Sequence, residues 1–222
     1  MTKRLVIYGV GQTSEVLSHL IASDESVEIV AYCDENKNSN QQFLEKPIVG
    51  LTDVKNIYDP DEHLFFVAIG YRNGNKIREK YIKQITELGY HLYSYIASPI
   101  NSSCQIGPNT VITSNNFIQP RAHIGTGVYI WGSCVIGHHT KLENYAWISP
   151  SVTIGGNSTI GERSFIGMGS VVNQFVNIAH DSVLGSKTLI NRDLDAASVI
   201  IEEASPSLGI KAEKFWKIGG VK

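Results

Sequence analysis

A strict period of six residues runs through the second half of the sequence, and no other feature constrains the fold as much. An aliphatic residue stands at every sixth position without a slip, at Ile100, Ile106, Ile112, Ile118, Ile124, Ile130, Ile136, Leu142, Ile148, Ile154, Ile160, Ile166, Val172, Ile178, Leu184 and Ile190. A helix repeats every ~3.6 residues and a strand every ~2, so neither requires a period of six. A coil of three short parallel strands joined by tight corners does require it.

The residues around each aliphatic position support this coil. A small side chain often stands two residues earlier, at Cys104, Thr110, Ala122, Cys134, Ala146, Ser158, Ser164, Ser170 and Ser182. Glycine often follows the aliphatic residue, at Gly107, Gly125, Gly137, Gly155, Gly161, Gly167 and Gly185. We expect these glycines to occupy corners that need a positive φ. Three strands per coil then predict about five stacked coils, an all-β solenoid over residues 97–192.

The first part of the chain, residues 1–96, has a different pattern. Apolar runs typical of buried strands alternate with amphipathic helices, the strands over residues 5–9, 29–34 and 64–70 and the helices over 13–22 and 75–88. This alternation predicts a small α/β domain with a parallel sheet of Rossmann type. After the repeats, residues 193–222 form a loop and tail, in which we expect a short helix over 211–217 to close the open end of the solenoid.

Composition excludes several classes of protein. The 19 Lys and Arg residues are balanced by 21 Asp and Glu residues, so the chain lacks the basic field of a general nucleic-acid binder. No apolar run approaches the ~20 residues of a membrane span, and the N-terminus does not resemble a secretory signal. The three cysteines form no CxxC pair, so we expect neither a disulfide framework nor a metal site. These features predict a cytoplasmic protein.

Both halves together resemble the hexapeptide-repeat acyltransferases of the sialic acid O-acetyltransferase and bacillosamine N-acetyltransferase group. The resemblance covers about residues 3–190 and is most specific at residues 148–172, ISPSVTIGGNSTIGERSFIGMGSVV. It implies that the solenoid is a left-handed β-helix, that acetyl-CoA is the cosubstrate and that the protein is a homotrimer. A trimer also has a physical rationale, because an acceptor site on a flat solenoid face needs a second wall.

Two adjacent histidines near a predicted corner, His138 and His139, are the candidate catalytic residues. Imidazole suits a general base because it exchanges protons near neutral pH. The resemblance places the base at His138, and His139 is the alternative. Related enzymes usually carry an acidic residue directly after the base, where this chain has His139. Glu143 or a residue of the neighbouring subunit could take the place of that acid.

The resemblance also implies a binding site for the coenzyme. By this resemblance, the backbone N–H of Gly156 faces the acetyl carbonyl oxygen, and Met168 and Ser186 line the coenzyme arm beside Gly167 and Gly185. Gly156 is out of phase with the corner glycines, which favours a special role for it. Gly167 and Gly185 are explained equally well as corner glycines of the solenoid.

The N-terminal domain carries a candidate nucleotide site. The turn Gly9-Val10-Gly11-Gln12-Thr13 follows the first predicted strand, and Asp34 ends the second. A glycine-rich turn followed by an acid at this spacing is typical of nucleotide binding. The resemblance adds Gly70, Asn75 and Arg78 at a strand-to-helix site, although a solvated helix residue is the alternative for Arg78.

The predicted function is acetyl-CoA-dependent N-acetylation of a nucleotide-linked amino sugar, a precursor of surface polysaccharide. One alternative is O-acetylation of a sugar such as sialic acid. The missing acid after His138 tilts the prediction toward N-transfer, because a neutral amine is already a nucleophile. Another alternative is a non-catalytic nucleotide-sugar-binding scaffold. A metal hydratase of the γ-carbonic anhydrase type is disfavoured, because the chain lacks the pair of histidines five residues apart.

Overall fold

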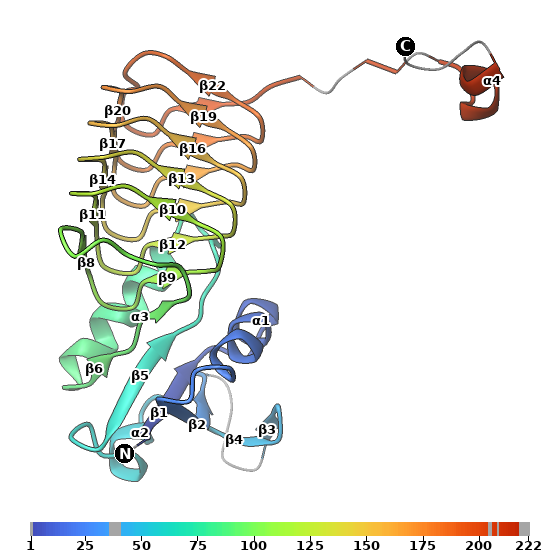
Figure 1. Ribbon diagram of the computed structural model, residues 1–222. Coiled ribbons are helices and arrows are strands. Elements are labelled where there is room, and N and C mark those ends of the chain that lie inside the picture. The colour runs from blue at the N-terminus through green and yellow to red at the C-terminus, as the bar shows by residue number, and fades with distance from the viewer. Residues whose placement is uncertain (1, 36–40, 204–205, 208, 218–222) are drawn as a thin grey trace.

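The computed structural model describes residues 2–35, 41–203, 206–207 and 209–217. It contains an α/β unit at the N-terminal end and a three-sided prism of stacked coils above it (Figure 1). Within the described residues, no helix is both long and apolar enough to cross a membrane. The two units are the predicted α/β domain and all-β solenoid.

The N-terminal sheet has six strands in the order β3-β4-β2-β1-β5-β6, and all adjacent pairs are parallel except β3 with β4. Its strands are β1 (Lys3–Tyr8), β2 (Val27–Cys33), β3 (Gln42–Phe43), β4 (Lys46–Val49), β5 (His63–Val67) and β6 (His91–Leu92). The chain passes from β1 outward to β2 and β4, and then returns to the opposite side of β1 as β5. Such a reversal opens a crevice at the carboxyl ends of the two central strands.

Alternate residues of β1 point into two different cores. Leu5 and Ile7 pack with helix α1 (Gln12–Ile21) on one face of the sheet. Val6 and Tyr8 pack on the other face with α2 (Val54–Ile57) and α3 (Lys76–Glu87). A strand covered on both faces is expected to be apolar along its covered length, as residues Leu5 to Tyr8 of β1 are. The predicted strands and helices of this domain are therefore confirmed.

The solenoid has three sheets of two-residue strands, one along each side of the prism. The aromatic face contains β7 (Tyr95–Ile96), β9 (Val111–Ile112), β12 (Tyr129–Ile130), β15 (Trp147–Ile148), β18 (Phe165–Ile166), β21 (Val183–Leu184) and β23 (Val199–Ile200). The polar face contains β8 (Gln105–Ile106), β11 (His123–Ile124), β14 (Lys141–Leu142), β17 (Thr159–Ile160) and β20 (Asn177–Ile178). The apolar face contains β10 (Phe117–Ile118), β13 (Val135–Ile136), β16 (Thr153–Ile154), β19 (Val171–Val172) and β22 (Leu189–Ile190).

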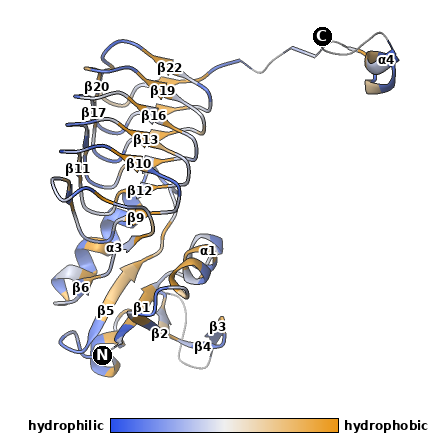
Figure 2. Ribbon diagram, in the orientation of Figure 1, coloured by the Kyte–Doolittle hydropathy of each residue, from blue (hydrophilic) through white to orange (hydrophobic). Residues whose placement is uncertain are grey.

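The second residue of almost every solenoid strand points into the prism. From Ile112 to Ile190 these aliphatic side chains form one continuous buried cluster. Successive coils pair in parallel, and from β8 to β22 each strand residue pairs with the one eighteen positions later, as Val135 does with Thr153. Hydrophobic strands and more hydrophilic corners therefore alternate along the coils (Figure 2). The period of six predicted this core and the number of coils.

The corner glycines serve a different purpose from the one predicted. The positive φ falls two residues after them, as at His139 (φ 59°) and Asn157 (φ 58°). A Cβ on Gly137 would lie 2.4 Å from the backbone nitrogen of Gly156 in the next coil. Real Cβ atoms do not approach backbone this closely. Glycine is therefore required at these corners because adjacent coils touch there, and the prediction of a positive φ was wrong.

The N-terminal unit covers the aromatic face of the prism. Tyr129 stacks on Phe66 of β5, with ring centroids 6.4 Å apart. The side-chain amide of Asn109 accepts a hydrogen bond from the N–H of Val67 at 2.7 Å and donates one to its carbonyl at 3.2 Å. At the adjoining corner, Arg163 forms an ion pair with Glu79 of α3 at 3.2 Å. Packing, hydrogen bonds and charge thus all join the two units.

The C-terminal helix does not close the solenoid. Helix α4 (Ala212–Lys217) has no buried residue and lies away from the prism (Figure 1). The last coil is covered instead by Leu194, which forms a bridge with Ile178, and by β23, which pairs with β21. A short polar-flanked helix buries too little apolar surface to dock by composition alone, so the predicted cap was wrong.

Candidate functional site

The crevice between β1 and β5 forms a cavity of ≈ 740 Å³. It is lined by Gly9–Thr13, by Asp34 and by Ala68–Arg72. Six of the residues predicted for substrate binding therefore lie together, namely Gly9, Gly11, Gln12, Thr13, Asp34 and Gly70. Tyr71 and Arg72 also line it and were not predicted. Their place directly after the third strand of the sheet was the signal that could have found them.

The glycines of this crevice have distinct local roles. Gly9 has a φ of +111°, and a Cβ there would lie 3.2 Å from the carbonyl oxygen of Ala68. A Cβ on Gly70 would lie 2.9 Å from the hydroxyl oxygen of Thr13. A Cβ on Gly11 would meet no protein atom within 4 Å. Backbone conformation thus favours glycine at Gly9 and the contact with Thr13 favours it at Gly70, whereas glycine at Gly11 keeps open space in the crevice.

Helix α1 begins at the floor of the crevice. Gly11 is its N-cap residue and has no side chain to bond the first turn. The N–H groups of an uncapped first turn carry partial positive charge and bind anions. Arg72 adds a full positive charge to the same cavity. This arrangement suits the phosphates of a nucleotide.

Asn75 and Arg78 are not part of the crevice, contrary to the prediction. Both side chains are fully buried. Arg78 donates to the backbone carbonyls of Gly127 at 3.0 Å and Tyr145 at 2.6 Å, and its guanidinium lies 4.5 Å from the centre of the Tyr129 ring. Burial lowers the pKa of Arg78 to about 10. Arg78 therefore links the two units, and the alternative of a solvated residue was also wrong.

The two candidate catalytic histidines lie at the corner between the apolar and polar faces. Both side chains are exposed. The Nδ1 atoms of His138 and His139 are 3.0 Å apart, and the backbone N–H of His138 donates to the side-chain oxygen of Gln119 at 2.9 Å. A Cβ on Gly156, in the next coil, would lie 2.8 Å from Nε2 of His138. We call His138, His139 and Gly156 the histidine corner.

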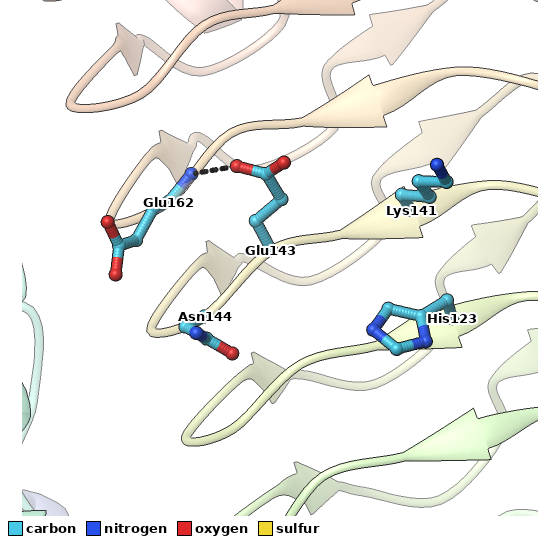
Figure 3. Close-up of a pocket in the computed structure, with 5 residues that line it drawn as sticks. All are labelled: His123, Lys141, Glu143, Asn144 and Glu162. Atoms are coloured by element: carbon cyan, nitrogen blue, oxygen red, sulfur yellow. Dashed lines mark hydrogen bonds between the residues drawn. The ribbon is translucent and has the colours of Figure 1, made fainter.

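Glu143 does not replace the missing acid at this corner. The two histidines of the corner precede strand β14 and Glu143 follows it, so they lie at opposite ends of that strand. The Glu143 carboxylate accepts a hydrogen bond from the backbone N–H of Glu162 at 3.1 Å. Figure 3 shows both glutamates at the turn, with His123 and Lys141 farther along the strands. These four residues and Asn144 line a polar cavity of ≈ 550 Å³. No group of three or more His, Cys, Asp or Glu suited to a metal ion occurs among the residues described.

The residues predicted to line the coenzyme arm lie at the opposite edge of the apolar face from the histidine corner. Met168 and Ser186 are exposed there, eighteen residues apart on successive coils. A Cβ on Gly167 would lie 2.4 Å from the carbonyl carbon of Gly185. Contact between coils thus accounts for Gly167. Within one chain, this edge and the histidine corner are separated by the width of the apolar face.

The crevice and the histidine corner lie on different sides of the same prism. Tyr71 in the crevice contacts the aromatic face, with its ring 5.1 Å from that of Trp147 and 5.0 Å from that of Phe165. His138 stands on the edge opposite this face, between the other two sheets. A ligand held in the crevice therefore lies across the prism from His138 of the same chain.

Two of the three cysteines, Cys33 and Cys134, are buried. Burial raises the pKa of the Cys33 thiol to about 12 and that of the Cys134 thiol to about 11. A thiol reacts as its thiolate, so these two are inert near neutral pH. The Cys134 sulfur lies 3.2 Å from the carbonyl oxygen of Ser149 inside the prism. This agrees with the small inward position at which the period places it.

Comparison with known proteins matches both units of the chain. Residues 4–85 match the family model of the PglD N-terminal domain, and residues 96–204 match that of the GMPPB C-terminal domain. Among curated protein sequences, none matches the chain.

Solved structures match nearly the whole chain. PerB from Caulobacter crescentus, in complex with CoA and GDP-perosamine, is 25% identical, with a TM-score of 0.78 over 91% of this chain and 95% of that one. A histidine-to-asparagine mutant of perosamine N-acetyltransferase from the same organism, with the same ligands, is 24% identical, with a TM-score of 0.80 over the same shares. The acetyltransferase domain of PglB from Neisseria gonorrhoeae, in complex with acetyl coenzyme A, is 23% identical, with a TM-score of 0.81 over 91% and 97%. The fold is thus a Rossmann-like domain followed by a left-handed β-helix.

Proposed function

We propose that this chain is a CoA-dependent acyltransferase of the hexapeptide-repeat sugar N-acetyltransferase group, and that it acetylates the amino group of a nucleotide-linked sugar. The observation that carries the proposal is the likeness over 91% of the chain to PerB, whose structure holds CoA and GDP-perosamine. Acetyl-CoA is the acyl donor. An enzyme with these substrates works where both are made, so we assign it to the cytoplasm and to the synthesis of surface glycan precursors.

The nucleotide binds in the crevice in this proposal. The first turn of α1 and Arg72 hold the diphosphate, because the open N–H groups and the guanidinium are complementary to its charge. Asp34 lies at the end of β2, where a carboxylate accepts hydrogen bonds from a ribose or a base. The open space at Gly11 lets the ligand approach the backbone.

The active site lies between subunits of a homotrimer in this proposal. The apolar face carries exposed side chains that have no partner within the described chain, with Phe117 at 62% and Leu189 at 61% exposure. A neighbouring chain that packs on this face protects them from water. It also brings another crevice toward the histidine corner, which the crevice of the same chain does not reach.

His138 is the general base. Its Nε2 takes a proton from the neutral sugar amine while the amine nitrogen attacks the carbonyl carbon of the thioester. The backbone N–H of Gly156 stabilises the oxygen that becomes negative. The C–N bond forms, the C–S bond breaks, and His138 passes the proton to the leaving thiolate. The products are the N-acetylated sugar nucleotide and CoA.

The test is thiol release from acetyl-CoA with a panel of nucleotide-linked amino sugars and their hydroxyl counterparts. We expect release with an amine acceptor, and a loss of roughly 10²- to 10⁴-fold in kcat for His138→Ala. His123→Ala is the matched control, because His123 is also an exposed solenoid histidine and its ring bonds Gln105 on the neighbouring coil. Release with hydroxyl acceptors alone would identify an O-acetyltransferase. No release with either class would identify a binding scaffold.

A further inference from the structure

We propose that His139 is a positioning residue of the transferase, and that its imidazole takes the place of an acidic partner for His138. The Nδ1 lone pair of His139 accepts the Nδ1–H of His138. That bond leaves the Nε2 of His138 without a proton and ready to act as the base. This inference rests on the proposed function and deepens it.

The distance between the two rings requires a shared proton. The Nδ1 atoms are 3.0 Å apart, and the rings meet edge to face with centroids separated by 5.2 Å. A neutral imidazole has one N–H and one lone pair, so one Nδ1 donates and the other accepts. If His138 donates, its Nε2 carries the lone pair that a base needs. If His139 donates, Nε2 of His138 is protonated and cannot accept a proton. An acceptor amine that donates to Nε2 selects the first arrangement.

The backbone holds the two rings in place from both neighbouring coils. His139 occupies the left-handed position of its corner, and its N–H donates to the carbonyl of Pro120 at 3.3 Å. The carbonyl of His138 accepts from the N–H of Asn157 at 2.9 Å, and its N–H bonds the Gln119 side chain at 2.9 Å. Two consecutive side chains on so constrained a corner lose little further freedom when they pair.

The charged groups around the pair are cationic. Arg121 holds the same corner position one coil below His139, and Lys141 follows two residues later on the polar face. Asn157 holds the corner position above and is neutral. Among the residues that the structure describes, no carboxylate forms an ion pair with either ring. In this part of the chain the partner of the His138 ring is therefore His139 and not a carboxylate.

Protonation of either ring abolishes the base in this arrangement. A protonated His139 has two N–H groups and no lone pair, so it cannot accept from His138. A protonated His138 has no free lone pair either. Two coupled groups lose their protons in macroscopic steps that belong to the pair, so an acid limb in the rate profile reports the dyad and not either ring alone.

The test uses three variants that tolerate the left-handed backbone. His139→Gly removes the acceptor, His139→Asn keeps a neutral one, and His139→Asp introduces a charged one. We expect His139→Gly to lower kcat about 10- to 100-fold with KM changed less than ~2-fold. His139→Asn should recover most of that loss. His139→Asp should move the acid limb of the kcat/KM profile up by about one pH unit, because a carboxylate favours the imidazolium. Asn115→Gly, a glycine at another exposed left-handed corner, is the control.

A second measurement does not depend on turnover. Imidazole ¹⁵N NMR of the free protein should show one Nδ1–H and one unprotonated Nδ1 in the pair, and His139→Gly should abolish that pattern. Full kcat and an unchanged pH profile in His139→Gly would overturn the proposal, as would two independent rings in the NMR spectrum. Absence of turnover in the wild type with the dyad visible by NMR would reject the proposed function while leaving the pair itself intact.

Discussion

The aromatic and apolar faces of the prism have similar chemistry and opposite surroundings. Both present large apolar side chains outward from two-residue strands. On the aromatic face Tyr129 is fully buried and Trp147 is 6% exposed, because the N-terminal unit packs over them. On the apolar face Phe117 and Leu189 are each more than half exposed. One face is therefore covered within the chain, whereas the other is left exposed, and under the proposed function a second chain covers it.

The largest loss of stability is expected from a substitution on the aromatic face, which the N-terminal unit covers. Tyr129→Ala should lower the free energy of unfolding by about 3–5 kcal/mol, because it removes a buried ring and the surface on which Arg78 lies. Urea denaturation of the variant measures the loss. An unchanged midpoint would mean that the N-terminal unit does not depend on this face.

Substitution of Arg78 should cause the next largest loss of stability. Arg78→Met should cost roughly 2–4 kcal/mol, because the carbonyls of Gly127 and Tyr145 lose their buried donor. Denaturation by urea again reads the change, with Lys80→Met on the exposed side of α3 as the control. Equal stability of the two variants would contradict the role of Arg78 as the link between units.

We expect substitutions on the apolar face to weaken assembly of the subunits and to change the stability of the folded chain very little. The double variant Phe117→Asp and Leu189→Asp should leave monomer stability within about 1 kcal/mol of wild type, since both side chains are exposed. Sedimentation should show dissociation to monomers, and turnover should fall together with it. A double variant that stays trimeric would place the interface on another face.

The smallest effect is expected in the pH dependence of stability, at the corner where Arg163 contacts the N-terminal unit. Arg163 donates to Asp181 at 2.8 Å, and that hydrogen bond lowers the pKa of the Asp181 carboxyl. A lowered folded-state pKa contributes stability above the unfolded value, and this stability is lost as pH falls through the folded one. We expect a loss of about 1 kcal/mol below pH ~4. Asp181→Asn should remove that part of the dependence in acid titrations of stability, and an identical slope in the variant would contradict it.

Local pattern predicted most of the fold. The strict recurrence of aliphatic residues predicted the buried prism, because only one inward position per strand can hold them. The role of the corner glycines could not be predicted, because contact between Gly137 and the next coil appears only when coils are stacked. The position of the C-terminal helix could not be predicted for a similar reason. Its sequence predicts a helix, and nothing local says where that helix lies.

The residues of the candidate site also differ in whether local sequence pattern could predict their place. The crevice residues stand directly after strands of a parallel sheet. The carboxyl ends of these strands lie at one edge, so the sequence predicts that these residues lie close together. Arg78 was misassigned because a polar helix residue gives no sequence signal of total burial against another domain. The pairing of His138 with His139 depends on the backbone of one corner, and adjacency alone does not predict it.

The central claim is that the crevice of one chain serves the imidazole of another, and subunit complementation tests it most directly. His138→Ala removes the base, and Gly11→Trp fills the crevice without backbone strain, because Gly11 has an extended backbone and no neighbour within 4 Å of its Cβ. Each variant alone should be inactive. Trimers reassembled from an equal mixture should regain about a quarter of wild-type turnover, since one site in four pairs an intact crevice with an intact histidine from a different chain. Mixed trimers that remain inactive would contradict the account.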